Sequence, residues 1–406
     1  MSISLGIGIK IGGNGINWAA YWATLVSAAV EGTAPTKVVI TFGDANTGLI
    51  ATDFTIAGKT ITLLERDITN KILTLTLSIP VVVDESLTLT FVQTGDTTPI
   101  TNNILLIDSF DVSALAYSFR KLRTAYAGSC IKVRRSSDDA TQDIGFSAGI
   151  LDTASLLTFI GVGNGYIDTL YDQSGNSQDL GNPVTTKQPL IAIGGALCLY
   201  NGRLVAIFDG VDDGLYRLNV PQTANKGFIG SFFVHRNRET GAGVEYIYFM
   251  GTGTSTTNAR FAFGRGASAG KYFNNGRRND ADGADIYSGA ANIDEVQKIS
   301  TVFVDYTNSN AYMYLNGVLD GSDTTFLTDG STTNTNSQNI SIGGDIYTAG
   351  DANESNLDFF EWIVFNTDIS ANRVAIEANQ SNFFFNLTGE AILTAAITYD
   401  SLIDSI

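Results

Sequence analysis

The chain is divided into many short runs of β-branched and aromatic residues that alternate with polar residues and end at glycine, asparagine or aspartate. Examples are KVVITF, KTITLLE, EYIYFMG and NAYMYLNGVLDG. This two-residue period is typical of strands with one buried face, and Asn-Gly and Asp-Gly pairs favour hairpin turns. The chain supplies such turns, since 42 of its 406 residues are glycine and only 6 are proline. The sequence therefore predicts an all-β protein.

Charge and residue counts exclude several classes of function. The chain carries 24 basic and 41 acidic residues, a net charge of −17, whereas nucleic-acid binding needs clustered lysine and arginine. Its single histidine, His235, cannot build a zinc site with two or three histidine ligands. Two cysteines, Cys130 and Cys198, cannot form a disulfide framework, and we expect both to be buried thiols. The chain has no run of 18 apolar residues, so no membrane span is predicted.

The runs group into four parts along the chain. Residues 35–106 predict a small antiparallel β-sandwich, and residues 107–389 predict a two-sheet jelly roll with short helices over 113–128 and 369–384. Residues 1–34 are predicted to hold a buried helix over 16–30, or to anchor the chain on another subunit, and to be mature sequence rather than a signal peptide. Residues 390–406 are expected to form a tail that packs on a neighbouring subunit or closes the sheet.

Two parts of the chain resemble known families. The pattern TFGDANTG…DFTIAG…LTLTLSIP is similar to bacterial immunoglobulin-like modules of surface and phage proteins, which implies a spacer or assembly role for residues 35–106. The segments AYSFRKLRTAYAGSC, LYDQSGNSQDLGN and GRLVAIFDGVDDGL resemble the catalytic domain of family-54 α-L-arabinofuranosidases. The later runs AYMYLNGVLDG and FFEWIVFNTDIS resemble concanavalin-A-like, laminin-G-like lectin domains. The resemblance covers roughly residues 110–386.

The arabinofuranosidase resemblance implies two catalytic carboxylates, and the chain supplies one of them. The family's acid/base aspartate matches Asp345 in ISIGGD. Its nucleophile glutamate falls on the stretch Thr252 to Ser255, which has no carboxylate, and its adjacent pocket cysteines are absent. A retaining glycosidase needs both carboxylates. The sequence therefore predicts that the domain is not catalytic, unless Glu239 or Glu245 replaces the nucleophile.

Aromatic and polar side chains in turns are the expected carbohydrate ligands. Sugar rings stack on aromatic faces while amide, carboxylate and guanidinium groups bind their hydroxyls. The predicted loop around Tyr272, Asn274 and Arg277, together with Asp345 and Tyr347, has this mixture of residues. These five residues are the predicted carbohydrate-binding set.

Other motifs are predicted to be structural. In YDQSG, Asp172 and Ser174 are expected to hydrogen-bond the backbone of a turn rather than supply a nucleophile. His235 is expected to pair with a neighbour in its strand, and the basic stretch Arg120 to Arg135 to form internal ion pairs. No cofactor or metal is predicted. The alternative is Ca²⁺ at one of two acidic loops: Asp209, Asp212 and Asp213, or Asp280, Asp282 and Asp285.

Together these features and resemblances imply a virion protein of a tailed bacteriophage: a fibre, decoration or receptor-binding subunit. The N-terminal region would contact other virion proteins and the lectin-like unit would bind host surface glycans, in a homo-oligomer such as a trimer. Such a protein is made in the host cytoplasm and becomes part of the extracellular particle. The alternatives are an active arabinofuranosidase-like hydrolase and a purely structural capsid or tail component that binds no sugar.

Overall fold

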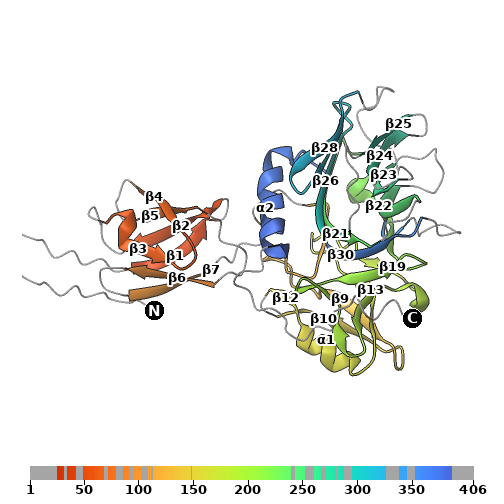
Figure 1. Cartoon of the computed structure of the whole chain (residues 1–406), viewed down its shortest axis with the longest axis horizontal. Coiled ribbons are helices and arrows are strands. Elements are labelled where there is room, and N and C mark those ends of the chain that lie inside the picture. Colours follow the sequence, from red (N-terminus) through yellow and green to blue (C-terminus); the bar gives the residue numbers. More distant parts are fainter. Residues whose placement is uncertain are drawn as a thin grey trace, which may run out of the picture. The chain divides into compact units, whose positions relative to one another are not determined.

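The computed structural model describes residues 25–31, 34–42, 49–67, 72–78, 86–91, 96–101, 108, 110, 113–147, 149–238, 243–251, 260–266, 271–279, 282–287, 295–325, 338–344 and 353–385. The chain divides into two compact units, Met1–Ser109 and Phe110–Ile406. Both units are built from antiparallel strands, and Figure 1 shows that helices are few. The prediction of an all-β fold with short flanking helices is therefore confirmed.

The first unit contains a four-stranded and a three-stranded antiparallel sheet. The first has the order β1 (Leu25–Glu31), β2 (Ala34–Phe42), β5 (Ile72–Leu77), β4 (Ile61–Arg66), and the second has β3 (Phe54–Ile56), β6 (Ser86–Phe91), β7 (Asp96–Thr101). Their alternating apolar residues, among them Val38, Leu75 and Leu89, form one core. A short 3₁₀ turn, Ala51–Asp53, precedes β3. The likeness to immunoglobulin modules stays a prediction.

The helix predicted over residues 16–30 is wrong in its described part. Residues 25–31 form strand β1, which pairs with β2 from Leu25 opposite Phe42 to Glu31 opposite Ala34. The apolar run therefore satisfies its backbone groups across strands rather than within a helix. It also joins the first sheet, ahead of the predicted start at residue 35.

The second unit contains two large antiparallel layers. One layer contains β28 (Val318–Asp323), β27 (Asn310–Leu315), β26 (Lys298–Asp305), β21 (Phe228–Asn237) and β30 (Asn356–Phe365), with β8 (Leu115–Ser118) and β19 (Ala206–Asp209) both beside β30. The other contains β25 (Asp282–Tyr287), β24 (Tyr272–Asn279), β23 (Arg260–Arg265), β22 (Glu245–Gly251), β29 (Gln338–Ile342), β20 (Leu215–Val220), β14 (Leu180–Gly181), β13 (Gly165–Leu170), β9 (Ile131–Arg135) and β10 (Thr141–Ile144).

Shorter elements complete the second unit. They are β11 (Phe146–Ser147), β12 (Ile150–Leu151), β15 (Leu190–Ile193), β16 (Ala196–Leu197), β17 (Leu199–Tyr200), β18 (Arg203–Leu204), helices α1 (Thr153–Ile160) and α2 (Arg373–Phe384), and 3₁₀ turns at Thr185–Lys187, Pro221–Thr223 and Ser370–Asn372. Strand β15 pairs with both β13 and β19, which links the two layers. The hairpin between β27 and β28 turns at Asn316 and Gly317, which both have positive φ, the backbone that such a two-residue turn needs.

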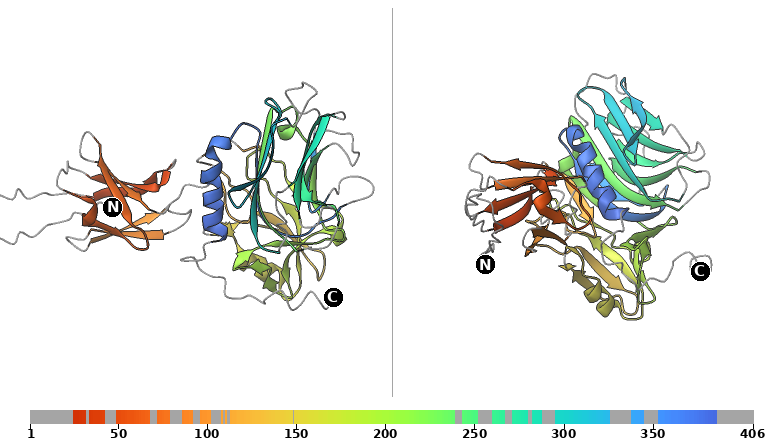
Figure 2. Two further views of the ribbon diagram at one scale, coloured as in Figure 1. Left: turned by 45° about the horizontal axis from the view of Figure 1, so that its top comes forward. Right: turned by 60° about the vertical axis from the view of Figure 1, so that its left-hand side comes forward.

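Aromatic side chains fill the space between the two layers. Phe233 of β21 contacts Tyr248 of β22 at 5.2 Å between ring centroids, and Tyr248 stacks on Trp362 of β30 at 4.9 Å. Helix α2 covers the opposite face of the β21–β26–β30 sheet, where Phe384 packs with Val234, Ile299 and Phe360. Figure 2 shows this order of layers: helix, sheet, sheet.

Two helix predictions have different outcomes. The helix predicted over 369–384 is confirmed as α2. The one over 113–128 is wrong, because residues 115–118 form β8. All four β8 residues are buried, with β30 along one edge and Asp172 and Gln173 bonded to Ala116 along the other. Helix α1 was not predicted; its signal is Asp152, whose carboxylate caps the backbone N–H of Ser155.

Candidate functional site

One row of residues crosses five strands on the face of the second layer that turns away from the core. In direct register it runs through Asp143 of β10, Lys132 of β9, Thr169 of β13, Gly181 of β14 and Tyr216 of β20. All five are exposed or only partly buried. Directly opposed residues of neighbouring strands point to the same side of a sheet. The register therefore gathers a carboxylate, an ammonium, a hydroxyl and a phenol on one open surface.

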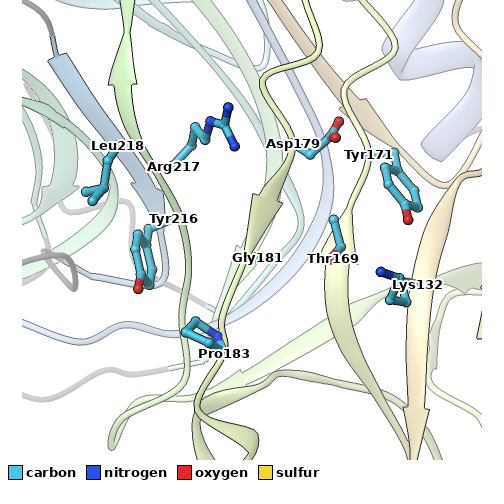
Figure 3. Close-up of a pocket in the computed structure, with 9 residues that line it drawn as sticks. All are labelled: Lys132, Thr169, Tyr171, Asp179, Gly181, Pro183, Tyr216, Arg217 and Leu218. Carbon is cyan, nitrogen blue, oxygen red and sulfur yellow. The ribbon is translucent and has the colours of Figure 1, made fainter. Parts of the chain in front are cut away.

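A groove of about 550 Å³ lies along this row. Its lining residues, labelled in Figure 3, are Lys132, Thr169, Tyr171, Asp179, Gly181, Pro183, Tyr216, Arg217 and Leu218. Gly181 lies between Thr169 and Tyr216 and contributes no side chain, so the surface is hollow there. A Cβ at this position would lie 3.0 Å from the carbonyl oxygen of Asp168, closer than an ordinary contact. We call this site the Gly181 groove.

Tyr171 and Asp179 line the groove next to Thr169 and Gly181, as Figure 3 shows, and we call these two side chains its rim. The Tyr171 hydroxyl donates to Asp143 Oδ1 at 2.7 Å, and Asp179 Oδ1 accepts from the backbone N–H of Asp172 at 2.9 Å. Partial burial, with the hydrogen bond to Asp143, raises the pKa of Tyr171, so the phenol stays protonated at neutral pH. Both rim side chains are thus fixed by the protein.

Lys132 and Arg217 are the two cations of the groove. Neither Lys132 nor Arg217 makes a hydrogen bond or an ion pair with any residue that the structure describes. The arginines of the basic stretch behave differently. Arg120 pairs with Glu361, Arg134 with Asp139 and Arg135 with Asp138, as the sequence predicted. Lys132 and Arg217 are therefore the basic groups that remain open to a ligand in the groove.

The YDQSG segment contributes Tyr171 to the groove, and side chains of the same segment hold its backbone in place. The buried Asp172 carboxylate accepts from the backbone N–H groups of Ala116, Ser174 and Gln178 at 2.9–3.1 Å, and from the Ser174 hydroxyl at 2.7 Å. Burial raises the pKa of Asp172, and these hydrogen bonds oppose the rise. Gln173 donates to the carbonyls of Ser118 and Arg120 and accepts from the N–H of Leu122. The predicted structural role of this motif is confirmed.

His235 and the two cysteines are also structural. His235 Nε2 lies 2.8 Å from Ser300 Oγ on the neighbouring strand, as predicted. Complete burial, with the nearby Lys298, lowers the pKa of His235 to about 3, so the ring is neutral at pH 7. Cys130 and Cys198 are buried free thiols, and burial raises both pKa values. These groups lie outside the Gly181 groove.

Of the predicted carbohydrate ligands, Tyr272 and Asn274 have described side chains, and neither lines the groove. Residues 272–279 form strand β24 rather than a loop. Tyr272 and Asn274 are buried there, and Tyr272 stacks on Phe263 in the core. For Arg277 the structure gives the backbone, opposite Arg260. Asp345 and Tyr347 lie outside the described residues, so the role of this set stays a prediction.

The positions that match the family's two catalytic carboxylates come after β22 and β29, which are paired antiparallel strands. Gly251, the last described residue before Thr252, is opposite Asn339 at the start of β29. Gly343, near the end of β29, donates its N–H to Ile247 O toward the start of β22. Thr252–Ser255 and Asp345 themselves lie outside the described residues. Glu245, which begins β22, forms an ion pair with the buried Arg265.

The two acidic segments differ in structure. The carboxylates of Asp209, Asp212 and Asp213 have oxygens within 4.8 Å of one another. Asp209 Oδ1 also accepts from the backbone N–H groups of Val211, Asp212 and Asp213, which is a turn role. In the second segment, residues 282–287 form strand β25 rather than a calcium loop, and Asp280 lies outside the described residues.

Comparisons with known proteins bear on residues 112–196. A sequence model of the family "Alpha-L-arabinofuranosidase B, catalytic" matches this range. The resemblance predicted from the sequence is confirmed there. Six of the nine residues that line the Gly181 groove lie within the range, and Tyr216, Arg217 and Leu218 lie outside it. No match is found among the curated proteins.

Solved structures that are similar to this chain include the following three. A family-54 α-L-arabinofuranosidase soaked with a cyclic sulfate inhibitor has 16% identity and a TM-score of 0.45, over 66% of this chain and 62% of that one. Botulinum neurotoxin type C, whose cell entry depends on interaction with two ganglioside molecules, has 15% identity and a TM-score of 0.36, over 52% of this chain and 49% of that one. The Ruminococcus gnavus IT-sialidase CBM40 with α2,3-sialyllactose has 14% identity and a TM-score of 0.31, over 38% and 84%.

The present chain therefore spans about 62% of the length of that arabinofuranosidase. Among the described helices, none is both long and apolar enough to cross a membrane.

Proposed function

We propose that this protein binds carbohydrate in the Gly181 groove and does not hydrolyse it. The observation that carries the proposal is the composition of this open groove: two tyrosines, one carboxylate and two cations that have no hydrogen bond or ion pair with any described residue, around a hollow at a glycine. Aromatic rings offer flat apolar faces to sugar rings, and charged groups make the stronger hydrogen bonds to hydroxyls. Concave sites with a few convergent polar groups are typical ligand sites.

The test is binding of the full chain to an array of immobilised oligosaccharides, followed by calorimetry on those that bind. Tyr216→Ala is expected to weaken binding at least about tenfold, or about 1.4 kcal/mol, because an aromatic face is lost. Tyr312→Ala is the matched control, since Tyr312 is a similarly part-buried strand tyrosine on β27, outside the groove. Absence of binding to every oligosaccharide, or equal loss in both variants, would contradict the proposal.

An active α-L-arabinofuranosidase is the second candidate, favoured by the family match over residues 112–196. It predicts release of arabinose from aryl arabinofuranosides, with the activity lost in Asp345→Asn. The absence of a carboxylate from Thr252 to Ser255 supports the non-hydrolytic proposal instead, because a retaining mechanism needs a nucleophile. Hydrolysis of an aryl arabinofuranoside by the wild-type protein, lost in Asp345→Asn, would establish that the protein is an enzyme.

The proposal includes a setting, the virion of a tailed bacteriophage. The support is the sequence pattern of an N-terminal sandwich followed by a glycosidase-like sandwich. There the first unit would contact other virion proteins and the second would bind host surface glycans, as a homo-oligomer. Mass spectrometry of purified particles is the measurement; a chain that remains in the lysate and never enters particles would overturn this setting.

A further inference from the structure

Arg217 differs from the other arginines of this chain. Every other arginine whose side chain the structure describes has a hydrogen bond, an ion pair or a ring contact. Arg217 has none among the described residues, and it lines the groove. Lys132, at the other end of the groove, is also without a partner there. In a chain of net charge −17, two such cations in one groove indicate a site for negative groups.

Lys132 and Arg217 lie on different strands, so a ligand that contacts both must be extended. Lys132 is on β9 and Arg217 on β20, with β13 and β14 between them. From Lys132 to Tyr216, which precedes Arg217 on β20, the row makes three steps between neighbouring strands, which at about 4.8 Å each give about 14 Å. Figure 3 shows Tyr216 and Arg217 on one side of Gly181 and Lys132 on the other. A single sugar unit is too short to occupy this length.

The acidic residues near the groove are engaged by the protein itself. Asp143 accepts from the Tyr171 hydroxyl, and one oxygen of Asp179 accepts from the N–H of Asp172. Each carboxylate is therefore fixed in place, with acceptor capacity left for sugar hydroxyls. Neither forms an ion pair with Lys132 or Arg217, so these two carboxylates do not occupy the hydrogen-bond donors of the two cations.

We infer that the Gly181 groove binds an extended anionic oligosaccharide, which lies across the strands with Lys132 and Arg217 on its negative groups and Tyr216 against a sugar ring. This inference rests on the proposed carbohydrate-binding function and specifies the class of ligand. The guanidinium of Arg217 binds carboxylate and sulfate oxygens in a bidentate fork, whereas Lys132 acts as a point charge.

The experiment compares matched pairs of oligosaccharides on the full chain. Each pair joins an anionic oligomer, such as an oligogalacturonate, a sialyl oligosaccharide or a sulfated glycosaminoglycan fragment, with its carboxyl-reduced or desulfated form. We expect at least one anionic member to bind at least tenfold more tightly than its neutral partner. Reduction and desulfation distinguish carboxylate from sulfate recognition.

Three variants in the groove and one control outside it test whether the groove causes the preference for anionic oligomers. Arg217→Gln and Lys132→Gln are each expected to weaken binding of the anionic oligomer about tenfold and to weaken binding of its neutral partner less, because only the anionic member loses a charge–charge contact. Lys121→Gln is the control, a part-buried lysine outside the groove. Asp179→Asn is expected to tighten binding of the anionic oligomer severalfold, because it removes a carboxylate that repels the ligand's negative groups. Its retained oxygen can still accept from the N–H of Asp172.

The outcomes separate the inference from the function on which it rests. Neutral partners that bind as tightly as the anionic members overturn the inference and leave the proposed function standing. Binding to no member of either kind overturns both. An anionic preference that persists unchanged in Arg217→Gln and Lys132→Gln also overturns the inference, because the charge is then recognised elsewhere.

Discussion

Arg120 and Glu361 form a buried bidentate ion pair between the segment after β8 and strand β30. The two nitrogen–oxygen distances are 2.7 and 2.9 Å, and both side chains are at most 3% exposed. Ser118 Oγ and Gln380 Nε2 complete the shell of Glu361. The Arg120 guanidinium also lies over the ring of Phe383 at 4.5 Å. One pair thus joins β8, β30 and α2.

We expect Glu361→Gln to lower the free energy of unfolding by about 3–5 kcal/mol, because it leaves the Arg120 charge buried without its counter-ion. Urea denaturation followed by tryptophan fluorescence measures this, since Trp362 is adjacent in sequence. The control is Asp138→Asn, which breaks the more exposed pair with Arg135 and should cost much less, because water screens that pair. Equal effects of the two variants would contradict the role of burial.

The YDQSG segment gives a second prediction. Asp172→Asn should destabilise the second unit by about 3 kcal/mol, because an amide nitrogen replaces an oxygen that accepts buried hydrogen bonds. Ser174→Ala should cost less and leave glycan binding unchanged. Loss of a measurable hydrolytic activity in a folded Ser174→Ala protein would show that Ser174 has a chemical role.

Asp213 gives a pH dependence of stability. Burial, with the neighbouring Asp209, raises its pKa to about 7 in the folded protein, above its unfolded value near 4. Between these pH values the folded state binds a proton that the unfolded state does not. Asp213 therefore makes the free energy of unfolding fall as pH rises from 4 to 7, by about 1.4 kcal/mol per pH unit.

Asp213→Asn should remove this slope and be more stable than wild type at pH 8. Melting temperatures from pH 4 to 8, with and without Ca²⁺, measure both effects. If the cluster of Asp209, Asp212 and Asp213 binds Ca²⁺, the ion stabilises wild type at pH 8 and not Asp213→Asn. A wild-type curve with the same slope as the variant would refute the raised pKa.

His235 contributes a slope of the opposite sign. Its pKa is lowered to about 3 by burial, below the unfolded value near 6.5. Between pH 6.5 and 3 the unfolded state binds a proton at His235 that the folded state does not bind. The free energy of unfolding therefore falls as pH falls. At pH 5 the loss is about 2 kcal/mol. His235→Asn should flatten this part of the curve, and an unchanged acid limb would contradict the assignment.

Gly181 tests the shape of the groove. Gly181→Ala places a methyl group in the hollow and should weaken glycan binding about tenfold, with a modest loss of stability from the contact with Asp168 O. Gly145→Ala is the control, because a Cβ there meets no atom within 4 Å. Both variants are assayed by calorimetry on the same oligosaccharide. Full affinity in folded Gly181→Ala would place the ligand elsewhere.

Local patterns in the sequence were enough to predict most strands and several roles. Alternation predicted β21, β22, β26 and β30, and Asn316–Gly317 predicted a hairpin, because strand period and turn conformation depend on neighbouring residues. The structural part played by Asp172 and Ser174 followed from their turn-forming chemistry. Apolar runs without clear alternation were ambiguous. Residues 25–31 and 115–118 are strands because their partners, β2 and β30, lie elsewhere in the chain.

The sequence by itself determined that this is an all-β protein, acidic, with a segment related to arabinofuranosidases. Only the tertiary structure decided which side chains meet. Lys132, Gly181 and Tyr216 are far apart in the chain and come to lie in one row across the sheet through strand register. Tyr272 and Asn274 have the residue types of a sugar site but face the core. Local alternation indicates that one face of a strand is buried, but which strands pair depends on contacts between distant segments, so only the tertiary structure shows which side chains share a surface.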